Sequence, residues 1–508
     1  MKSEVVTVEP SLAVERPHPA LRADLPSKWG GVETWRIPIL TGLVLALVTA
    51  IPYVFAYAVQ PPGHVFMGFF FLGDDANTYL AKMRQGWEGS WAWQNRYTTE
   101  SSPAAYLFMF WILLGHIAAI SNLPLLVVFH LARVAAAFAL MAAAWLFTRH
   151  FIQDRSARRF AFFLCALGLG LGYVIQALGH PVALGVALTL KAIERGSLWL
   201  GVLAGVAWLG QASIHPQMPI LMGGATAVAL MLRPAPPKGW MAAALAFAIP
   251  APYVLYSYLA FVGNPQVERW TFHSKNALPP ETVSLLFAIA PQLLLAVFGL
   301  LPALRRRTRE DLFLVAWLVL LAAILYLPNP AGDLRRRFLD GLYLPLVVLG
   351  ARGMYEVILP RFRSARAHAL VPFTYVALTT IGSAFLILAP LAVAGQPQYS
   401  VSTAEYAGLS WLGAQPAGRV LCMPGVGLYV PAYSPDTVYV GHYDETFDYQ
   451  SKTETAYAVL TGRSDIEGFI RTNQIRYVVW TVELQTPPPS VLGPPAYDTA
   501  TFKIWKLY

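Results

Sequence analysis

Long apolar runs dominate this sequence and constrain its fold more than any other feature. The first run, residues 37–59, would span about 30 Å as an α-helix at about 1.5 Å per residue, which matches the hydrocarbon core of a bilayer. The whole chain is 56% apolar and only 13% charged, so water alone cannot solvate it. We therefore expect an all-α polytopic domain of about 11–13 transmembrane helices over residues 37–395. The further runs are 103–121, 124–148, 159–179, 181–195, 197–214, 217–232, 238–262, 282–304, 311–328, 334–354 and 368–394.

Several classes of protein are excluded by the composition and by the motifs that the chain lacks. Two cysteines, Cys165 and Cys422, cannot make a disulfide framework or a thiolate metal site. The sequence has no Gly-rich phosphate loop, no dinucleotide fingerprint and no nucleophile elbow, which excludes ATP-driven transport and serine hydrolysis. The net charge of +9 does not indicate nucleic acid, because residues 396–508 are net acidic and the basic excess belongs to the membrane part.

The positions of the basic residues orient the runs in the membrane. The N-terminal tail, 1–36, lacks the pattern of a cleaved signal and is expected in the cytoplasm of a cell with a bacterial-type plasma membrane. Four connectors rich in Lys and Arg are expected on the same side: 149–159, 233–238, 305–309 and 361–366. An exoplasmic C-terminus then needs an odd number of crossings, whereas the runs above give an even number. Either 103–121 is not a simple span, or a crossing is hidden, or the N-terminus lies outside.

The texture changes at about residue 396 to short apolar segments separated by Gly, Pro and polar residues. Alternating patterns predict strands at 437–440, 475–480 and 501–508. Helices are expected at 403–413, 452–461 and 464–473, the last with Ser464 as its N-cap and Glu467 completing a capping box. We therefore expect residues 396–508 to form a small α/β domain on the exoplasmic side.

The first polar loop, 60–102, holds the densest chemistry. Asp74 and Asp75 follow an apolar run near the end of a transmembrane helix, where neighbouring carboxylates are expected to raise one another's pKa, as a general base requires. The alternative is that they cap the helix that follows them. Tyr79, Met83 and Trp87 recur on one face of that helix and predict an amphipathic segment at the membrane surface, with the aromatic rings as anchors or as sugar-stacking groups.

These features resemble the GT-C class of polyprenol-dependent membrane glycosyltransferases, which includes oligosaccharyltransferases, protein O-mannosyltransferases and aminoarabinose transferases. The resemblance rests on the single N-terminal span, the acidic pair, the amphipathic helix with its Gly-x-Trp-like turn, the Pro-opened hydrophobic helix and Arg133 in the next one. It implies a GT-C fold and an active-site acid at Asp74 or Asp75. Ser101-Ser102-Pro103 stands where relatives carry His-Pro-Pro, and a Trp-Trp-Asp motif is lacking, so the resemblance does not identify the acceptor.

Basic groups expected on the exoplasmic side are candidates for binding a donor phosphate. Guanidinium groups bind phosphate oxygens bidentately, although snorkelling to lipid headgroups or pairing with Asp333 and Asp340 would also explain arginines there. His215 and His180 each precede a proline at the boundary of a run. The candidates are Arg335, Arg336, Arg337, Arg96 and His215, with weaker candidates His180, Glu268, Arg269, His273 and Lys275.

Acidic and aromatic residues suit recognition of an acceptor sugar, and paired acids could hold a divalent cation such as Mg²⁺ or Mn²⁺. No spacing typical of His or Cys metal ligands is found in the sequence. The acceptor-binding candidates are Tyr79, Trp87, His442, Asp444 and Glu445, of which the last three could equally form a solvated turn.

The sequence therefore predicts an inverting glycosyltransferase that moves a sugar from a polyprenyl-phosphate donor to an acceptor at the exoplasmic face. The rivals are a secondary transporter or flippase and a non-catalytic envelope assembly protein. Transporters commonly show repeated halves and mid-membrane charges, and neither is evident here.

Overall fold

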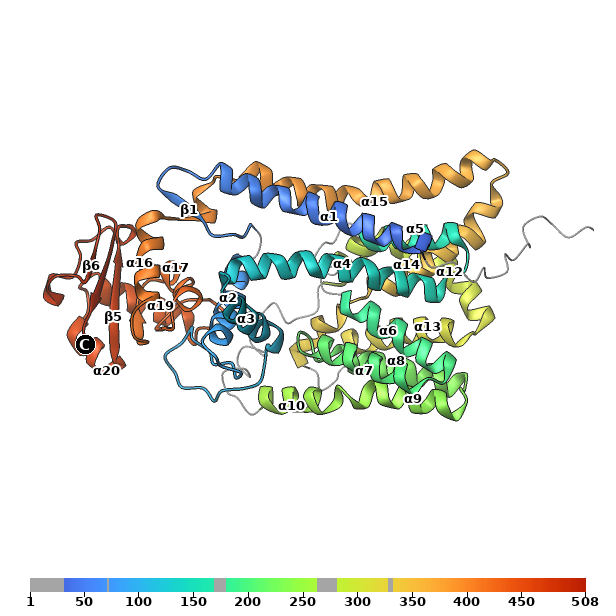
Figure 1. Cartoon of the computed structure of the whole chain (residues 1–508), viewed down its shortest axis with the longest axis horizontal. Helices are drawn as coiled ribbons and strands as arrows, with labels where there is room; N and C mark the ends of the chain where they lie inside the picture. The colour runs from blue at the N-terminus through green and yellow to red at the C-terminus, as the bar shows by residue number, and fades with distance from the viewer. Residues whose placement is uncertain (1–31, 71–72, 169–179, 263–280, 328–331) are drawn as a thin grey trace, which may run out of the picture.

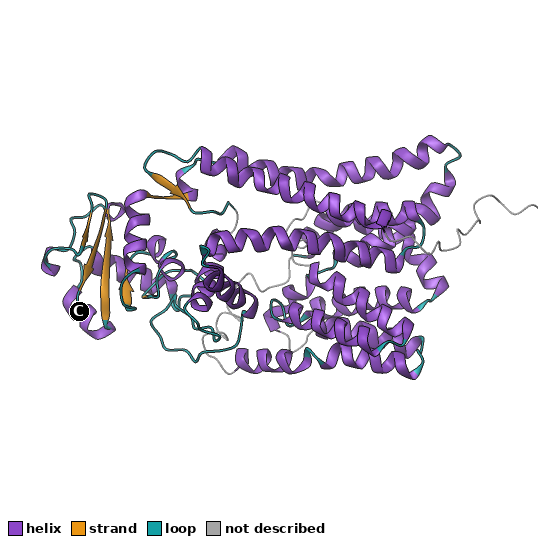
Figure 2. Cartoon of the chain, viewed as in Figure 1, coloured by secondary structure: helices purple, strands orange, loops and turns teal. Residues whose placement is uncertain are grey.

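A computed structural model describes residues 32–70, 73–168, 180–262, 281–327 and 332–508. A long helical bundle carries a small C-terminal α/β unit at one of its ends (Figure 1). Within these ranges, the strands belong to that unit and to one short pair at its junction with the bundle (Figure 2). The expected fold class, a helical membrane part followed by a small α/β part, is confirmed.

Six helical segments of the described residues are long and apolar enough to cross a membrane. They are Trp35–Ala58 within α1 (Val32–Ala58), α4 (Leu125–Phe151), Pro237–Val262 comprising α9 (Pro237–Ala248) and α10 (Ala251–Val262), α12 (Thr282–Arg306), Arg335–Arg361 with α14 (Tyr343–Arg352), and α15 (Ala365–Val393). Shorter helices pack with them: α5 (Arg155–Leu167), α6 (His180–Arg195), α7 (Leu198–Ala212), α8 (Met218–Leu232) and α13 (Arg309–Tyr326). Trp145, Trp208 and Trp317 are fully buried in the large apolar core of the bundle.

The run at 103–121 does not form a full-length span. Its chain first pairs with the preceding loop through a bridge between Trp93 and Ala105, and only Met109–Ser121 is helical (α3). Thirteen residues cover about 20 Å, less than the hydrocarbon core of a bilayer. The helix α3 packs on α2 (Gly73–Trp87) and α4. This geometry fits the explanation that 103–121 is not a simple span. Without this run, the number of apolar runs is odd, as an exoplasmic C-terminus requires.

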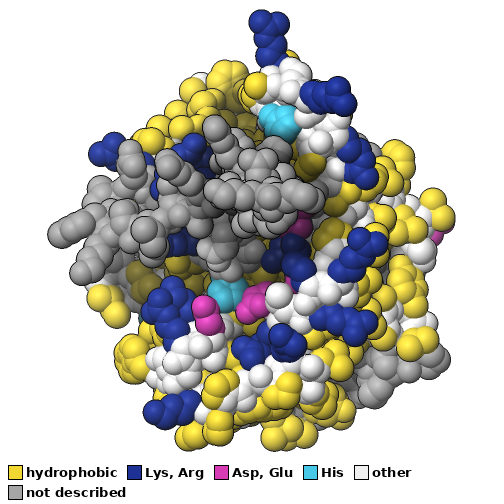
Figure 3. Space-filling view, turned by 90° about the vertical axis from the view of Figure 1, so that its right-hand side faces the viewer, with side chains coloured by type: hydrophobic (Ala, Val, Ile, Leu, Met, Phe, Trp, Pro, Cys, Tyr) yellow, Lys and Arg dark blue, Asp and Glu magenta, His cyan; other side chains and the backbone are white. Residues whose placement is uncertain are grey.

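Basic side chains gather at the end of the bundle opposite the C-terminal unit (Figure 3). The connectors that join α4 to α5, α8 to α9, α12 to α13 and α14 to α15 supply them, as the distribution of charge in the sequence predicts. Lysines and arginines concentrate on the cytoplasmic side of membrane proteins. The exposed members of this set are Arg149, Arg155, Arg159, Arg233, Lys238, Arg305, Arg306, Arg307, Arg361, Arg363 and Arg366.

The C-terminal unit is built on a five-stranded sheet of order β4-β3-β5-β7-β6. The central strand β5 pairs parallel with β3 and antiparallel with β7. Tyr477 and Val479 of β5 face one apolar cluster, and Val478 and Trp480 face another, because successive side chains of a strand point to opposite faces. The strands are β3 (Arg419–Leu421), β4 (Thr437–Val438), β5 (Ile475–Thr481), β6 (Tyr497–Asp498) and β7 (Phe502–Lys506).

Helices cover both faces of the sheet. The helices α16 (Thr403–Gly413) and α18 (Val430–Tyr433) contribute to the first cluster, and α19 (Tyr449–Leu460) and α20 (Ile466–Asn473) to the second. The predicted helix 403–413 and the three predicted strands are confirmed. The predicted cap Ser464 is wrong: Asp465 caps α20 by accepting a hydrogen bond from the Glu467 amide at 3.0 Å, because it directly precedes the first helical residue.

A second, two-stranded sheet joins the first polar loop to the C-terminal unit. The strand β1 (His64–Phe66) pairs antiparallel with β2 (Ser400–Ser402). The loop and the unit also share a core, since Ala81 of α2 and Tyr97 belong to the first apolar cluster. The unit is therefore anchored on the loop that carries the acidic pair.

Candidate active site between the bundle and the C-terminal unit

The helix that carries the acidic pair is enclosed on most of its sides. Gly86 of α2 and Gly115 of α3 allow the two helices to touch, since a Cβ at either position would lie within about 2.1 Å of a backbone oxygen of the other helix. Met83 is fully buried and Tyr79 stacks on Trp111 with ring centroids 4.3 Å apart. The ring of Tyr79, which the sequence predicted as a membrane anchor or a sugar-stacking group, is therefore packed against protein. The apolar stripe packs on α3, a contact that the pattern within α2 does not specify.

The two acids of the first turn of α2 differ in their surroundings. Asp74 is exposed to solvent. Asp75 has 40% of its side chain exposed and its Oδ1 lies 3.6 Å from Nε2 of His442 in the C-terminal unit. The interaction with His442, together with the charges of Lys82 and Arg337, holds the pKa of Asp75 below its usual value, although partial burial opposes this shift. The prediction that the acids raise one another's pKa is wrong for Asp75, which faces cationic groups and a histidine.

A buried ion pair fixes α2 to the C-terminal unit. Lys82 Nζ lies 2.7 Å from Glu445 Oε1, and only 3% and 5% of these side chains are exposed. The backbone carbonyl of Glu445 also accepts a hydrogen bond from Asn95 Nδ2 at 2.7 Å. The sequence analysis did not single out Lys82, because its partner Glu445 lies far away in the sequence. Glu445, a candidate for acceptor binding, is engaged in this contact.

The loop of the C-terminal unit that contains His442 is docked on the first polar loop. Thr446 Oγ1 donates to the carbonyl of Tyr97 at 2.7 Å and accepts from the amide of Gly441 at 3.0 Å. The backbone amides of Asp444 and Glu445 donate to His442 Nδ1 at 3.2 and 3.3 Å. The segment expected as either an acceptor site or a solvated turn is thus partly buried against α2.

Arg337 belongs to the same electrostatic environment as the acid. Its segment, the 3-10 helix Gly332–Leu339, precedes α14. The positive charge of Arg337 lowers the pKa of Asp75. Burial and the negative charge of Asp75 raise the pKa of Tyr79 to about 12, and the charge of Arg337 opposes this rise. The described residues offer Arg337 no hydrogen bond or ion pair within 4 Å. Its guanidinium group therefore acts on the Asp75 carboxylate through its charge and is not engaged in an ion pair with the described residues.

His215 and Asp340 lie close to this arginine. His215 Nδ1 is 3.3 Å from Asp340 Oδ2, both side chains are mostly buried, and the Arg337 charge acts on both. The connector between α7 and α8 thus meets the segment before α14. Arg335 donates to the carbonyl of Leu325 at 3.3 Å, and Arg336 is half-buried. Asp340, which the sequence analysis treated only as a possible ion-pair partner of the arginines, instead contacts His215.

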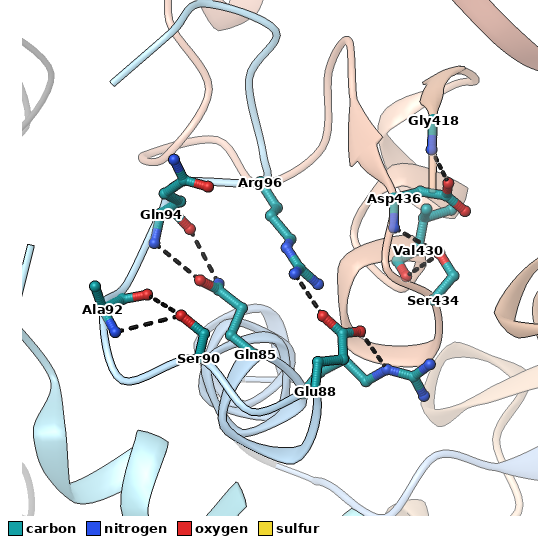
Figure 4. Close-up of polar contacts among 11 residues, drawn as sticks. Gln85, Glu88, Ser90, Ala92, Gln94, Arg96, Gly418, Val430, Ser434 and Asp436 are labelled. Carbon is teal, nitrogen blue, oxygen red and sulfur yellow. Dashed lines mark hydrogen bonds and ion pairs between the residues drawn. The ribbon is translucent and has the colours of Figure 1, made fainter. Parts of the chain in front are cut away.

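Arg96 is engaged on the other side of α2. Its guanidinium contacts Glu88 Oε2 at 2.5 Å, and Arg84 Nε contacts Glu88 Oε1 at 2.7 Å (Figure 4). Burial raises the pKa of Glu88, but the two arginines lower it by more than burial raises it. The pKa of Glu88 is therefore below its usual value. Gln85 and Gln94 exchange hydrogen bonds beside this cluster (Figure 4). These contacts hold the turn after α2, and they leave Arg96 committed to Glu88.

Two aromatic candidates take different positions. Tyr79 is enclosed by Trp111 and lies near Lys82, whose Nζ is 5.8 Å from the ring centroid. Trp87 is 43% exposed, with the Arg84 guanidinium 4.5 Å from its ring. The structure brings Asp75, Tyr79, Arg337, His215, His442 and Glu445 together and leaves Asp74, Arg96 and Trp87 outside this group. The side chains of His180 and Asp333, and Glu268, Arg269, His273 and Lys275, lie outside the described residues.

A divalent cation does not fit the described part of this site. No three His, Cys, Asp or Glu side chains come together as a potential metal site within the described ranges. The groups whose charges act most directly on Asp75 are His442, Lys82 and Arg337, and the two permanent cations would oppose a metal ion at that carboxylate.

Comparison with known proteins identifies the fold. The sequence matches no protein-family model and no curated protein. A mutant form of arabinofuranosyltransferase AftD from Mycobacteria matches with a TM-score of 0.55 at 16% identity, over 93% of this chain and 41% of that chain. The chain thus spans about two fifths of AftD.

An oligosaccharyltransferase from Archaeoglobus fulgidus in the apo form matches with a TM-score of 0.49 at 14% identity, over 88% of this chain and 70% of that chain. The archaeal enzyme AglB in complex with an inhibitory peptide and a dolichol-phosphate gives 0.48 at 13% identity, with the same coverage. Structural similarity at such low sequence identity indicates a shared fold. The similarity to AftD shows that this chain has the GT-C fold of membrane glycosyltransferases.

Proposed function

We propose that this protein is an integral membrane glycosyltransferase that moves a sugar from a polyprenyl-phosphate donor to an acceptor hydroxyl, with Asp75 as general base and Arg337 at the donor phosphate. The observation that carries the proposal is that Asp75 lies at the junction of the bundle and the C-terminal unit, 3.6 Å from His442, in an electrostatic environment to which Arg337, from the other half of the chain, contributes a positive charge. The GT-C fold supports the same class of reaction.

The chemistry follows from the two charges. Asp75 accepts the proton of the acceptor hydroxyl while the hydroxyl oxygen forms a bond to the anomeric carbon from the face opposite the phosphate. The bond between the anomeric carbon and the phosphate oxygen breaks, and its electron pair leaves with the polyprenyl phosphate. Arg337 stabilises the negative charge that develops on that group. A carboxylate whose pKa is held low is ionised at neutral pH, as a base must be before the reaction.

The lipid-linked donor rests on the position of Arg337. A phosphate held by a membrane lipid reaches the bilayer boundary, and guanidinium is the side-chain group that best matches its oxygens. His215, beside the same arginine, is a second candidate for contact with the donor. AglB binds a dolichol-phosphate, but its TM-score of 0.48 is too low to support a donor for this chain.

Arg337→Gln is expected to weaken binding of undecaprenyl phosphate. Hydrogen bonds to charged groups contribute about 1.5–3 kcal/mol, which corresponds to a roughly 10- to 100-fold increase in Kd. Native mass spectrometry or thermophoresis on the detergent-solubilised protein measures the change. Arg363→Gln, at the opposite end of the bundle, serves as the matched control and should leave Kd unchanged. Equal effects of the two substitutions would mean that general charge, and not a site at Arg337, attracts the lipid.

The proposal also places the C-terminal unit outside the cell and the basic end of the bundle in the cytoplasm of a bacterial-type plasma membrane. Both native cysteines are buried, so introduced cysteines can be labelled selectively. A cysteine replacing Ser451, exposed on α19, is expected to react with a membrane-impermeant maleimide in intact cells. A cysteine replacing Ser156, exposed at the start of α5, should react only after permeabilisation. The reverse labelling pattern would place Asp75 on the cytoplasmic side and would contradict the proposal of a lipid-linked donor.

The direct test is transfer of radiolabelled sugar by the purified protein in proteoliposomes. A panel of undecaprenyl-phosphate monosaccharides is supplied with a membrane extract as the source of acceptor. A glycosyltransferase gives a labelled product and releases undecaprenyl phosphate in equal amount. Movement of the intact donor across the bilayer without a new product would identify a flippase and refute the proposal.

A further inference from the structure

The surroundings of His442 in the C-terminal unit differ from those of an acceptor-binding residue. Its ring is buried, and its two nitrogens have unlike surroundings. Only 3% of the side chain is exposed. The ring lies between Tyr443, with centroids 4.6 Å apart, and Tyr97, with centroids 6.0 Å apart. These two rings limit rotation of the imidazole and set its plane relative to α2.

The hydrogen bonds determine which nitrogen carries the proton. His442 Nδ1 accepts from the backbone amides of Asp444 and Glu445, so this nitrogen has no hydrogen in the neutral ring. The hydrogen of the neutral imidazole must therefore be on Nε2. Nε2 is buried and has no hydrogen-bond partner within standard geometry among the described residues. It points at Asp75 Oδ1 from 3.6 Å.

A buried donor without a partner is costly, and a movement of less than 1 Å would satisfy it. Nitrogen and oxygen in a hydrogen bond lie about 2.7–3.2 Å apart, and contacts of catalytic groups are often long before substrate is bound. The other carboxylate oxygen of Asp75 would stay free for an acceptor hydroxyl. The loop that carries His442 is itself held by Thr446 and by the buried pair of Lys82 and Glu445.

We propose that His442, in its Nε2–H form, is a positioning residue that orients the carboxylate of Asp75, so that the C-terminal unit completes the active site. The inference rests on the proposed role of Asp75 as general base. Among the described residues, the groups that interact electrostatically with Asp75 are Tyr79 and Lys82 of its own helix, His442 of the C-terminal unit and Arg337 of the segment before α14. Of these, only His442 lies within 4 Å in a defined pairwise contact.

The role predicts a change in the protonation of Asp75 that a purely structural histidine would not cause. His442→Phe fills the same space but has no donor, so the charged carboxylate loses an interaction that favours it. The pH at which Asp75 becomes half-protonated should therefore rise, by about one unit or more. His442→Gln retains an N–H donor at a similar distance from the backbone and should keep most of the wild-type midpoint.

Carbodiimide coupling, which requires a protonated carboxyl group, measures this midpoint without any substrate. The detergent-solubilised full-length protein is treated over a pH series, and modification of Asp75 is counted by peptide mass spectrometry. His116→Phe is the matched control, because His116 on α3 also has a buried, unpartnered Nε2 and stacks on Trp91, with centroids 3.9 Å apart. Wild type, His116→Phe and His442→Gln are expected to share nearly the same modification midpoint. The midpoint of His442→Phe is expected at a higher pH.

Turnover supplies the second measurement. In the sugar-transfer assay, His442→Phe should lower kcat by about 100-fold, the effect of misplacing a reacting group by about 1 Å, while KM for the donor stays unchanged. Equal modification midpoints for wild type and His442→Phe would overturn the positioning role even if transfer activity is present. Conversely, full activity of Asp75→Asn would refute the general-base proposal, whereas the midpoint experiment would still report whether His442 acts on Asp75.

Discussion

Asp75→Asn is expected to lower kcat for sugar transfer by roughly 10²–10⁴, the usual contribution of a general base. The asparagine has nearly the same size as aspartate, and its carbonyl oxygen can still face His442 Nε2, so the fold should be preserved. The amide cannot accept the proton of the acceptor hydroxyl. The measurement is initial-rate kinetics with the lipid-linked sugar that the wild-type protein uses, and KM for the donor is expected to change little because Arg337 is intact.

Asp74→Asn is the matched control for this substitution. Asp74 occupies the same turn of α2 but is exposed, and its charge acts on Tyr97 and Tyr429 of the neighbouring loop and unit instead of on the cationic groups around Asp75. Its substitution should leave kcat within a few-fold of wild type. A large loss from Asp74→Asn with normal turnover by Asp75→Asn would assign the reaction to the other acid. Normal turnover by both variants would exclude either residue as the base.

The pH dependence of turnover carries the same information. The proposed base must be ionised to accept a proton, so the rate should fall as the pH drops through the pKa of Asp75 and stay constant above it. Because His442, Lys82 and Arg337 hold this pKa below its usual value, the acidic limb should lie below the range of an ordinary aspartate. An acidic limb near neutral pH would instead indicate a base with a raised pKa and would contradict the charge distribution around Asp75.

The helical bundle could be predicted from the sequence because hydrophobicity and length are local properties. A run such as 368–394 reveals α15 (Ala365–Val393) without reference to any other segment. The run at 103–121 was wrong as a span for a non-local reason. One face of its short helix covers α2, with Gly86 and Gly115 in close backbone contact, while Leu113, Ile117 and Ile120 on the rest of the helix stay exposed. Composition alone does not distinguish these two environments.

The candidate site shows the same limit. The pair Asp74 and Asp75 stood out in the sequence because charge is unusual near the end of an apolar helix, and Arg335, Arg336 and Arg337 because basic residues are uncommon on the exoplasmic side. Lys82 did not, since a lysine on a polar helix face is ordinarily solvated. Its partner Glu445 and the histidine beside Asp75 come from the C-terminal unit, and only the docking of that unit on the first loop brings them to α2. The sequence therefore pointed to candidate reacting groups, whereas the groups that hold Asp75 in its surroundings follow from the docking of the C-terminal unit.

The docking contact gives the largest expected effect on stability. Lys82→Met is expected to lower the free energy of unfolding of the C-terminal unit by about 3–5 kcal/mol, because it leaves the Glu445 carboxylate buried without a partner. Cys422 reports the loss, since it is fully buried in the first apolar cluster and burial raises the pKa of its thiol, so that it reacts only when the unit opens. Thermal unfolding followed by thiol labelling, with Cys422 and Cys165 separated by mass spectrometry, measures the shift.

A double substitution distinguishes a lost attraction from an uncompensated charge. Lys82→Met combined with Glu445→Leu removes both charges, and replacing a buried ion pair by apolar residues is often neutral, so most of the stability should return. The backbone carbonyl of residue 445 still accepts from Asn95 in this variant. Arg84→Met is the matched single control, since its pair with Glu88 is more exposed, and it should cost less than about 1 kcal/mol. If Lys82→Met unfolds the unit no earlier than Arg84→Met does, the buried pair does not fasten the C-terminal unit to α2. The loop that carries His442 would then be held by other contacts, such as the hydrogen bond from Thr446 to the carbonyl of Tyr97.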